Sequence, residues 1–257
     1  MLAYFTVLFA ACSNPPVVKG QVLDIWNQPI TGAMVKMEGE VEAQTTTADG
    51  SFQFPAKDGS MRFRAGHENY IHDVEVGVFS SSDEEPPPTV TFHLYKKPSK
   101  EGFYAISTDD YASIVGQKVH AIETQLQSIK GIKDIGETKV SVDQSDSFLF
   151  FSTLRKEQIK QFKLQLHGLD FTESIQIKSI TGTTEAAVNL YTVSSQAAID
   201  FDLVSLDSDF MYLLKPKEAL APGYYAFHDS DILTNQESKS HDSYPAELKV
   251  VYSFEVK

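Results

Sequence analysis

Short runs of β-prone residues, separated by turn residues at intervals of roughly 8 to 12 positions, dominate the first hundred positions of the chain. Asn27-Gln28-Pro29 and Ala48-Asp49-Gly50 supply turns, because proline fixes φ and Asp-Gly accepts positive φ. No long helical period interrupts the region, so the pattern predicts a β-sandwich over residues 17–97. Its predicted strands are Val17–Leu23, Ala33–Glu38, Ala43–Thr47, Ser51–Phe54, Met61–Arg64, Tyr70–Val78 and Thr89–Tyr95.

One of these strands shows a regular alternation of apolar and other residues. Val74, Val76 and Val78 alternate with Glu75 and Gly77. Successive side chains of a strand point to opposite faces, so residues two apart share a face. We therefore expect the valine face of this strand to be buried.

Two segments have the composition of loops or linkers. Ser80–Pro88 is rich in serine, acidic residues and proline and cannot pack a core. We expect it to be an exposed loop before the last strand of the first domain, because an interdomain linker there would leave Thr89–Tyr95 as an orphan strand. The better linker lies within Lys96–Lys100, and we place it at residues 98–101.

The remainder of the chain, residues 102–257, is again mainly β, with a less familiar pattern. The usual prior of about 100 to 200 residues per domain also favours two domains for this chain. The predicted strands are Gly102–Ile106, Lys139–Val142, Ser147–Phe151, Phe162–Leu166, Ser174–Ile180, Ala187–Val193, Ile199–Val204, Phe210–Leu214, Leu220–Phe227 and Leu248–Val256.

One segment of this second domain has a helical period. Apolar residues recur there at spacings of four and three, which predicts one helix near residues 113–130. Lys130 in the last turn and Gly131 at the C-cap fit its end, whereas the internal Gly116 and the frequent β-branched residues favour a strand instead. The apolar positions are Tyr111, Val115, Val119, Ile122, Leu126 and Ile129.

The run Leu220–Tyr225 resembles the corner where immunoglobulin and fibronectin-type sandwiches enter their penultimate strand. In that corner a tyrosine hydroxyl bonds back to nearby backbone, and Tyr225 is the candidate here. Glu101–Ala105 echoes Pro222–Ala226, which suggests two related strands. The predicted fold class is therefore all-β, with two β-sandwich domains: a transthyretin-like or immunoglobulin-like one first, and an immunoglobulin-like one second.

The first domain resembles a known family in three segments. Val18–Asp24, Gln28–Val35 and Thr45–Phe52 are similar to the carboxypeptidase regulatory-like domain. The resemblance implies a small transthyretin-like sandwich, in which Asp49-Gly50 forms a hairpin turn and Phe52 fills the core. It implies little about function, because that module accompanies many envelope proteins as a spacer or binding unit.

The N-terminus has the pattern of a lipoprotein signal. The uncharged run Leu2–Ala11 is followed by Cys12, the only cysteine of the chain. Its length matches the apolar region of a signal peptide and falls short of the roughly 20 residues of a membrane span. Small residues before Cys12 resemble the lipobox of bacterial lipoproteins, which implies a diacylglyceryl thioether, with fatty acids such as palmitate, on that cysteine. No lysine or arginine precedes Lys19, so the true start could lie upstream.

This resemblance predicts a location for the chain. Residues 1–11 would be a signal peptide, and residues 12–16 a tether to a membrane that the protein does not cross. Ser13 follows the cysteine where lipoproteins retained in the inner membrane often carry aspartate, which favours the outer membrane. The alternative is a cytosolic protein with an apolar N-terminus and a free thiol.

Composition and charge exclude several classes of partner. A formal net charge of -13 argues against nucleic-acid binding and against electrostatic docking to anionic lipid. The partners we predict are the membrane, through the lipid anchor, and an unidentified envelope protein or polysaccharide. Hydrophobic content of 42% and charged content of 22% are ordinary for folded domains.

Motifs for catalysis or metal binding are weak, and we predict no enzyme activity, no metal and no cofactor. His67 and His72 are five residues apart, one more than the zinc-protease helix motif requires. The sequence contains no Gly-x-Ser-x-Gly motif and no phosphate-binding glycine loop. Four acidic pairs lack the spacing of a calcium loop and favour solvated turns: Asp143 with Asp146, Asp200 with Asp202, Asp207 with Asp209, and Asp229 with Asp231.

The sequence thus predicts a lipid-anchored envelope protein that acts as a non-catalytic binding or scaffolding module. Trp26, at a predicted turn, is a candidate partner contact. The alternative is a hydrolase, or a hydrolase accessory acting on envelope polymers, with His120, His167 or His228 gathered beside carboxylates in the second domain. A third hypothesis is a calcium-dependent adhesin.

Overall fold

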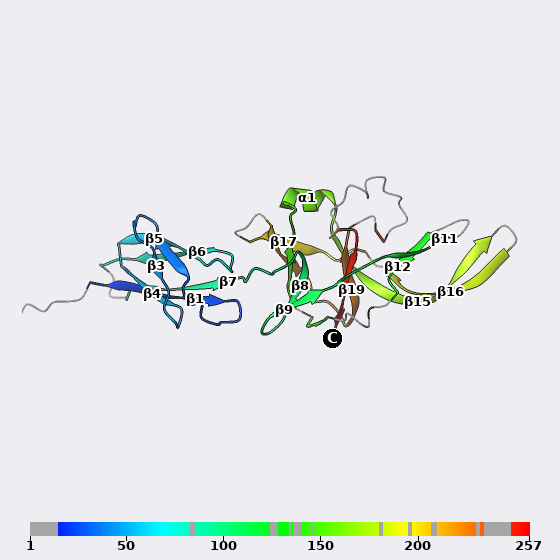
Figure 1. The fold of residues 1–257 in the computed structure, drawn as a ribbon, viewed down its shortest axis with the longest axis horizontal. Coiled ribbons are helices and arrows are strands. Elements are labelled where there is room, and N and C mark those ends of the chain that lie inside the picture. The colour runs from blue at the N-terminus through cyan, green and yellow to red at the C-terminus, as the bar shows by residue number, and fades with distance from the viewer. Residues whose placement is uncertain are drawn as a thin grey trace, which may run out of the picture. The chain divides into compact units, whose positions relative to one another are not determined.

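The computed structural model describes residues 15–82, 86–123, 128–133, 135, 140–144, 146–179, 182–194, 197–206, 210–229, 232–233 and 248–257. The chain divides into two compact units, Met1–Lys97 and Pro98–Lys257, each built of β-sheets (Figure 1). The prediction of an all-β protein with β-sandwich domains is confirmed. Cys12 and the predicted signal peptide lie outside the described residues.

The first unit is a sandwich of two sheets. One sheet has the order β4-β1-β7, in which β1 pairs antiparallel with β4 and parallel with β7, and the other has the order β3-β2-β5-β6. The seven predicted strands are all present, with ends shifted by a few residues. They are β1 (Val17–Asp24), β2 (Met34–Met37), β3 (Gln44–Thr45), β4 (Ser51–Pro55), β5 (Gly59–Gly66), β6 (Asp73–Phe79) and β7 (Thr89–Leu94).

The core of this unit forms where the inner faces of the two sheets meet. Phe52 and Phe54 of β4 meet Phe63 of β5, with ring centroids 6.4 and 5.8 Å from Phe63, and Phe52 also lies 6.0 Å from Phe92 of β7. Phe52 therefore does fill the core as the sequence predicted. Burial of each such ring contributes on the order of 2–3 kcal/mol, so the phenylalanine cluster is a major source of stability.

The expectation of a buried valine face on β6 is wrong. Val76 and Val78 are 56% and 69% exposed, whereas Gly77 between them is buried. The inner face is closely packed here, because a Cβ on Gly77 would lie 3.1 Å from the Pro88 side chain and 3.7 Å from Phe63. The large neighbours fill the core, and the valines are left on the outer face.

The second unit contains two larger sheets and a separate hairpin, β11-β12. One sheet has the order β17-β18-β14-β8-β9, and the other has the order β10-β20-β19-β15-β16, with β13 also pairing with β20. The elements are β8 (Gly102–Ile106), β9 (Tyr111–Ile114), β10 (Gly116–Gln117), β11 (His120–Glu123), β12 (Ser128–Gly131), β13 (Ser141–Val142), β14 (Phe148–Phe151), α1 (Lys156–Gln161), β15 (Gln165–Ser179), β16 (Gly182–Val193), β17 (Phe201–Ser205), β18 (Met211–Pro216), β19 (Gly223–His228) and β20 (Val251–Val256).

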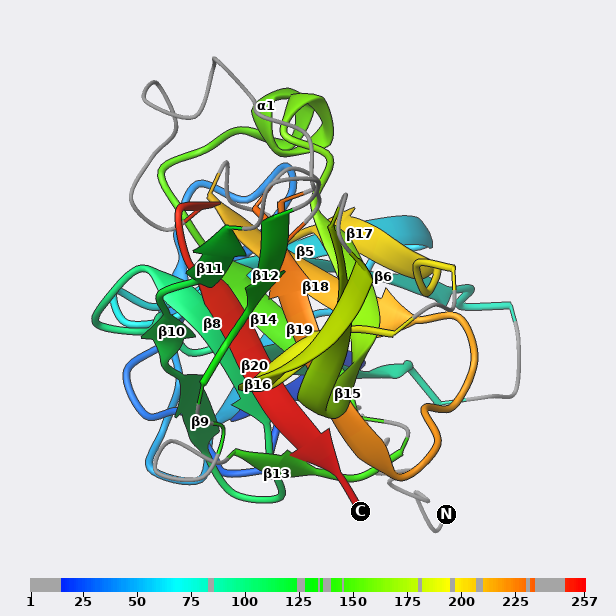
Figure 2. The same ribbon diagram turned by 90° about the vertical axis from the view of Figure 1, so that its right-hand side faces the viewer.

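An aromatic cluster joins the two sheets of this unit. Phe103 of β8 lies 5.1 Å from Phe227 of β19, and Phe148 of β14 lies 4.6 Å from Phe254 of β20. All four rings are fully buried. The sheet that contains β19 and β20 accordingly lies over the sheet that contains β8 and β14 in Figure 2. The hairpin of β15 and β16 extends beyond this core (Figure 1).

The predicted helix near residues 113–130 is wrong. The described part of that segment forms the end of β9, then β10, β11 and β12, and residues 124–127 lie outside the described residues. Ile114 is buried and Val115 is 50% exposed, as on a strand. Gly116 pairs with Tyr252 of β20, and a Cβ at Gly116 would lie 2.5 Å from Val250. Pairing with distant strands therefore overrides the helical spacing.

A short helix, α1, which the sequence did not predict, precedes a strand that begins three residues later than predicted. Phe162 is the C-cap of α1, and β15 begins only at Gln165. The side chain of Gln158 accepts a hydrogen bond from the Arg155 backbone N–H at 2.9 Å, and Ile159 is the buried residue of the helix. One apolar residue in six positions gives no readable helical period, so the sequence could not predict this element.

The core of the first unit predicts a severe effect of Gly20→Ala. A Cβ at Gly20 would lie 2.2 Å from the Phe52 ring and 2.3 Å from the Val90 carbonyl oxygen, and Gly20 pairs with both residues in the sheet. We expect the substitution to lower the free energy of unfolding by about 2–3 kcal/mol, measured by chemical denaturation. The neighbouring exposed control, Lys19→Ala, should change it by less than about 0.5 kcal/mol. Equal effects of the two substitutions would contradict this account of the core.

Candidate functional site

The outer face of β5 carries two of the three arginines of the chain. Met61, Phe63 and Ala65 of this strand are buried in the core. Because alternate residues point to opposite faces, Arg62 and Arg64 lie on the outer face, and both are exposed. The sandwich core thus sets the direction of both guanidinium groups.

A third cation lies beside them on the neighbouring strand. Lys36 of β2 is directly opposite Arg64 in the antiparallel pairing of β2 with β5. Directly opposite residues have Cβ atoms about 4.5–5.5 Å apart, and like charges in that arrangement destabilise a sheet. The gathering of Lys36 and Arg64, in a chain of net charge -13, marks the face as a candidate binding site.

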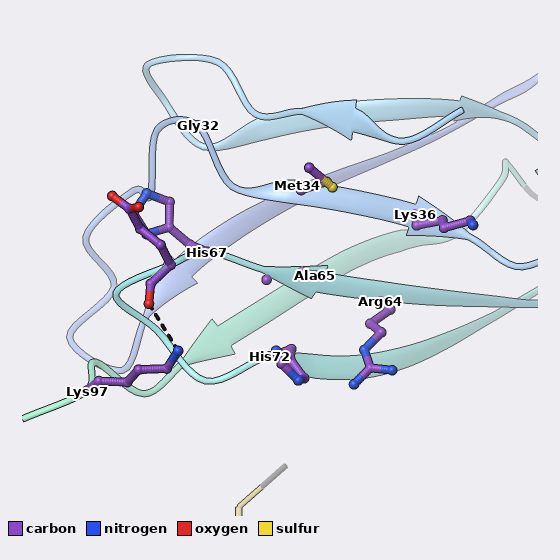
Figure 3. A pocket seen from close by; sticks show the side chains of 10 residues that line it. Gly32, Met34, Lys36, Arg64, Ala65, His67, His72 and Lys97 are labelled. Atoms are coloured by element: carbon purple, nitrogen blue, oxygen red, sulfur yellow. Dashed lines mark hydrogen bonds between the residues drawn. The ribbon is translucent and has the colours of Figure 1, made fainter. Parts of the chain in front are cut away.

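The cations border a hollow of about 730 Å³ on the first unit. Figure 3 shows Lys36 and Arg64 along β2 and β5, and Lys97 on a loop at the other end, where its Nζ donates a hydrogen bond of 3.0 Å to the Glu68 carbonyl oxygen. The volume falls within the roughly 300–1,000 Å³ of known ligand sites. The hollow is lined by Gly32, Met34, Lys36, Arg64, Ala65, Gly66, His67, Glu68, His72 and Lys97.

A second, smaller hollow continues the first along the same face. It measures about 460 Å³ and shares Lys36 and Arg64 with the larger one, while Arg62 lines it further along β5. Its other lining residues include Glu38 and Glu40, of which Glu40 forms an ion pair with Lys57. We call the two adjoining hollows and the exposed residues of β2, β5 and β6 around them the cationic face.

Exposed apolar side chains border the cationic face. Met34 of β2 is 61% exposed and lines the larger hollow, and Val76 of β6 pairs with Arg62. Val78 lies two residues further along β6, on the same outer face. A ligand for this face therefore meets positive charge and apolar surface together.

The two histidines of the near-motif both line the larger hollow. His67 lies in the turn after β5, where its Nδ1 accepts a hydrogen bond of 3.2 Å from the Asn69 backbone N–H, and His72 is exposed just before β6. Neither residue lies on a helix. Among the residues that the structure describes, no group of three or more His, Cys, Asp or Glu side chains is arranged to hold a metal ion.

Trp26 lies in the turn after β1 and is half-buried, so it is less exposed than its position suggested. Its backbone N–H donates to the Asp24 carboxylate at 2.9 Å, and the same oxygen accepts from the Gln28 N–H at 2.8 Å. It does not line either hollow. Its role as a partner contact stays a prediction.

Tyr225 has the geometry of a tyrosine corner. Its hydroxyl donates a hydrogen bond of 2.7 Å to the Ala221 carbonyl oxygen, four residues upstream. The similar segment Glu101–Ala105 forms the same kind of corner. Its Tyr104 hydroxyl donates a hydrogen bond of 2.6 Å to the Lys100 carbonyl oxygen, also four residues upstream. Each tyrosine follows, by two residues, a glycine with positive φ. Burial raises the pKa of both hydroxyls, so they stay protonated donors at neutral pH.

The second unit brings two of its predicted catalytic histidines together. His167 of β15 and His228 of β19 are buried, with His167 Nδ1 2.9 Å from His228 Nε2. His228 Nδ1 lies 2.6 Å from the Asp229 carbonyl oxygen, which can only accept, so this nitrogen carries a proton and Nε2 accepts from His167. Burial lowers the pKa of His228 to about 4 and lowers that of His167.

His228 does not give the hydrolase hypothesis its base, whereas His167 keeps Nε2, the ring nitrogen that this tautomer leaves unprotonated. Both ring nitrogens of His228 are used inside the protein, so it has none left for a substrate. His120, the third predicted histidine, is exposed on β11. The hydrolase alternative therefore stays a prediction.

The pair Asp143 and Asp146, and the single residue Asp200, have partners typical of turns and exposed surface. The Asp143 backbone N–H donates to the Asp146 carboxylate at 2.8 Å, as in a turn. Asp200 is exposed, and its Oδ2 lies 3.7 Å from Lys217 Nζ in an ion pair. Asp202 is exposed and Asp229 is buried. Asp207, Asp209 and Asp231 lie outside the described residues.

Comparisons with known proteins do not identify a family. No family model matches the chain, and no curated protein matches it. A weak structural match is the crystal structure of BcpA, the major pilin subunit of Bacillus cereus, at 10% sequence identity, with 94% of this chain and 67% of that chain covered and a TM-score of 0.25. A score this low does not establish a common arrangement, so the likeness carries no functional argument. The carboxypeptidase regulatory-like resemblance stays a prediction.

None of the described residues belongs to a helix with the length and hydropathy of a membrane span.

The strands of the cationic face were predicted from the sequence, but the face itself was not. Arg62 and Arg64 alternate within a predicted strand, which was a readable signal. The net charge of -13 masked it, because an average over the chain hides a local group of cations.

The two tyrosine hydrogen bonds predict matched losses of stability. We expect Tyr225→Phe and Tyr104→Phe each to lower the free energy of unfolding by about 1 kcal/mol, because each leaves one carbonyl without its donor. The measurement is chemical denaturation of the full chain. Tyr224→Phe serves as the neighbouring control on β19. The corner assignment fails if this control costs more than Tyr225→Phe.

The buried histidine pair predicts a loss of stability in acid. The folded pKa of His228 is about 4 and its unfolded value is 6.5, so only the unfolded chain takes up a proton between these values. The stability is complete above pH 6.5 and falls as the pH is lowered towards 4, by about 3 kcal/mol in total from this group. Unfolding free energies across this pH range should show a smaller fall in His228→Gln than in the exposed-site control His120→Gln. Identical pH profiles would exclude this role for His228.

Proposed function

We propose that this protein is a lipid-anchored component of a bacterial cell envelope that acts as a non-catalytic binding or scaffolding module through the cationic face of its first unit. The observation that carries the proposal is the hollow of about 730 Å³ lined by Lys36, Arg64 and Lys97. Cations gathered around a concave surface are a binding feature that needs no catalytic group.

The charge of the whole chain sharpens the selectivity of this face. A protein of net charge -13 repels anions in general, so an anionic partner is attracted only where cations gather locally. At physiological ionic strength the Debye length is about 8 Å, which screens distant charges and leaves close ones effective. The cationic face can therefore attract an anionic partner despite the acidic remainder of the chain.

The proposed anchor would hold the first unit close to the membrane. Cys12 precedes the first strand, which begins at Val17, by five residues. Five extended residues span at most about 18 Å. With two or three acyl chains on Cys12, attachment would be stable, and the outer membrane is the location that Ser13 favours. A partner of the cationic face would then be met near the membrane surface.

The anchor is tested by comparing the chain with its Cys12→Ser variant in a bacterial host. We expect the unchanged chain to partition into the detergent phase and to carry a diacylglyceryl group on Cys12 by mass spectrometry, because acyl chains supply about 0.8 kcal/mol per buried methylene. The variant should partition into the aqueous phase. An intact Met1 with a free thiol would refute the anchor.

The binding role is tested by crosslinking in native membranes. We expect envelope partners to be recovered with the unchanged chain and lost from the double variant Lys36→Gln/Arg64→Gln. Lys19→Gln is the matched control, because Lys19 is an exposed lysine of β1, in the other sheet of the same sandwich. Recovery of the same partners with all three proteins would place binding elsewhere and refute this use of the cationic face.

A further inference from the structure

The spacing of charges on the cationic face is that of an extended peptide. Arg62 and Arg64 are two residues apart on β5, which places their Cα atoms about 7 Å apart on one face. An extended polypeptide repeats its same-face side chains at the same interval. Carboxylates on alternate residues of such a peptide would meet the two guanidinium groups in turn, and arginine binds carboxylates with paired hydrogen bonds.

The neighbouring positions extend this match in two directions. Lys36 lies opposite Arg64, so one carboxylate could contact both cations. Lys97, held by the Glu68 carbonyl oxygen, lines the far end of the larger hollow and offers a further positive charge. A peptide laid along β5 would therefore meet these four cations, with Glu38 beside Arg62 and Glu68 in the larger hollow as acidic neighbours of the row.

Apolar surface on the same face favours a peptide over an anionic polysaccharide. Met34, Val76 and Val78 are 61%, 56% and 69% exposed beside the cations. Apolar side chains of a peptide would remove this surface from water at about 25 cal/mol per Å². A sulfated or carboxylated polysaccharide has no aliphatic side chains that could pack against these three residues.

We propose that the cationic face binds an extended acidic segment of a partner protein, with carboxylates on alternate residues and apolar residues at its ends. This inference rests on the proposed binding function and specifies its ligand. The carboxylates contact Arg62, Arg64 and Lys36, and the apolar residues cover Met34 and Val76.

The test uses the full chain and short fluorescent peptides. The probe has glutamate at every second position, threonine between the glutamates and valine at both ends. We expect it to bind in a fluorescence-polarisation titration, with affinity that falls as salt is raised. A peptide of the same composition, with its glutamates in one block, should bind about tenfold more weakly, because fewer carboxylates then share a face. Equal affinity for both peptides would overturn the spacing argument.

Variants of the face provide the second arm of the test. Arg64→Gln and Arg62→Gln should each raise the Kd of the alternating peptide by about tenfold, the loss expected for one charged hydrogen-bonded contact. Lys19→Gln should leave the Kd unchanged, because Lys19 is exposed on β1 of the other sheet. Val76→Thr tests the apolar contact and should weaken binding without changing its salt dependence. Equal losses in Arg64→Gln and Lys19→Gln would show non-specific attraction and overturn the proposal.

Two other occupants are outcomes of the same experiment. Tighter binding of a sulfated dextran than of the alternating peptide, lost in Arg64→Gln, would overturn the peptide inference but leave the binding function intact. Self-association in sedimentation, abolished by Arg64→Gln, would identify a second copy as the occupant and also overturn it. If the envelope crosslinks fail to depend on Lys36 and Arg64 while the peptide binds normally, the proposed function fails and the peptide site stands.

Discussion

The placement of the cationic face depends on one constraint, the burial of the inner row of β5. Met61, Phe63 and Ala65 pack in the core of the first unit, and Phe63 contacts the phenylalanines of β4. A shift of the strand by one residue would bury Arg62 and Arg64 and expose Phe63, at a cost of many kcal/mol. The same packing that stabilises the sandwich therefore fixes the direction of the arginines.

The face also gathers like charges that packing alone would not require. Lys36 and Arg64 are opposite each other across two paired strands, and an opposite-charge pair there would be more stable by a few tenths of a kcal/mol or more. The exposed valines Val76 and Val78 place apolar surface beside these charges. Both features become favourable when an anionic, partly apolar partner covers the face. The local energetics thus point to binding.

Sequence pattern predicted the strands better than their faces. The seven strands of the first unit follow from period-two alternation and turn residues, because both signals are local. The orientation of β6 does not, since the packing of Phe63 and Pro88 against Gly77 joins residues that are distant along the chain. The helix predicted near residues 113–130 failed for a similar reason, because pairing of Gly116 with Tyr252 is a distant contact that no local pattern contains. The contact between His167 and His228 was equally hidden, because it joins strands 61 residues apart.

Rigidity of the supporting sheet makes side-chain recognition effective at this site. β5 is paired on both sides, with β2 and with β6, so the backbone positions of Arg62 and Arg64 are fixed before a partner arrives. Binding then has to order only the ends of long side chains, which cost about 0.5–1.5 kcal/mol each. Charges on a free loop would require backbone ordering as well, at about 1–2 kcal/mol per residue. A central strand is therefore a favourable place for a row of cations that must match a repeat of about 7 Å.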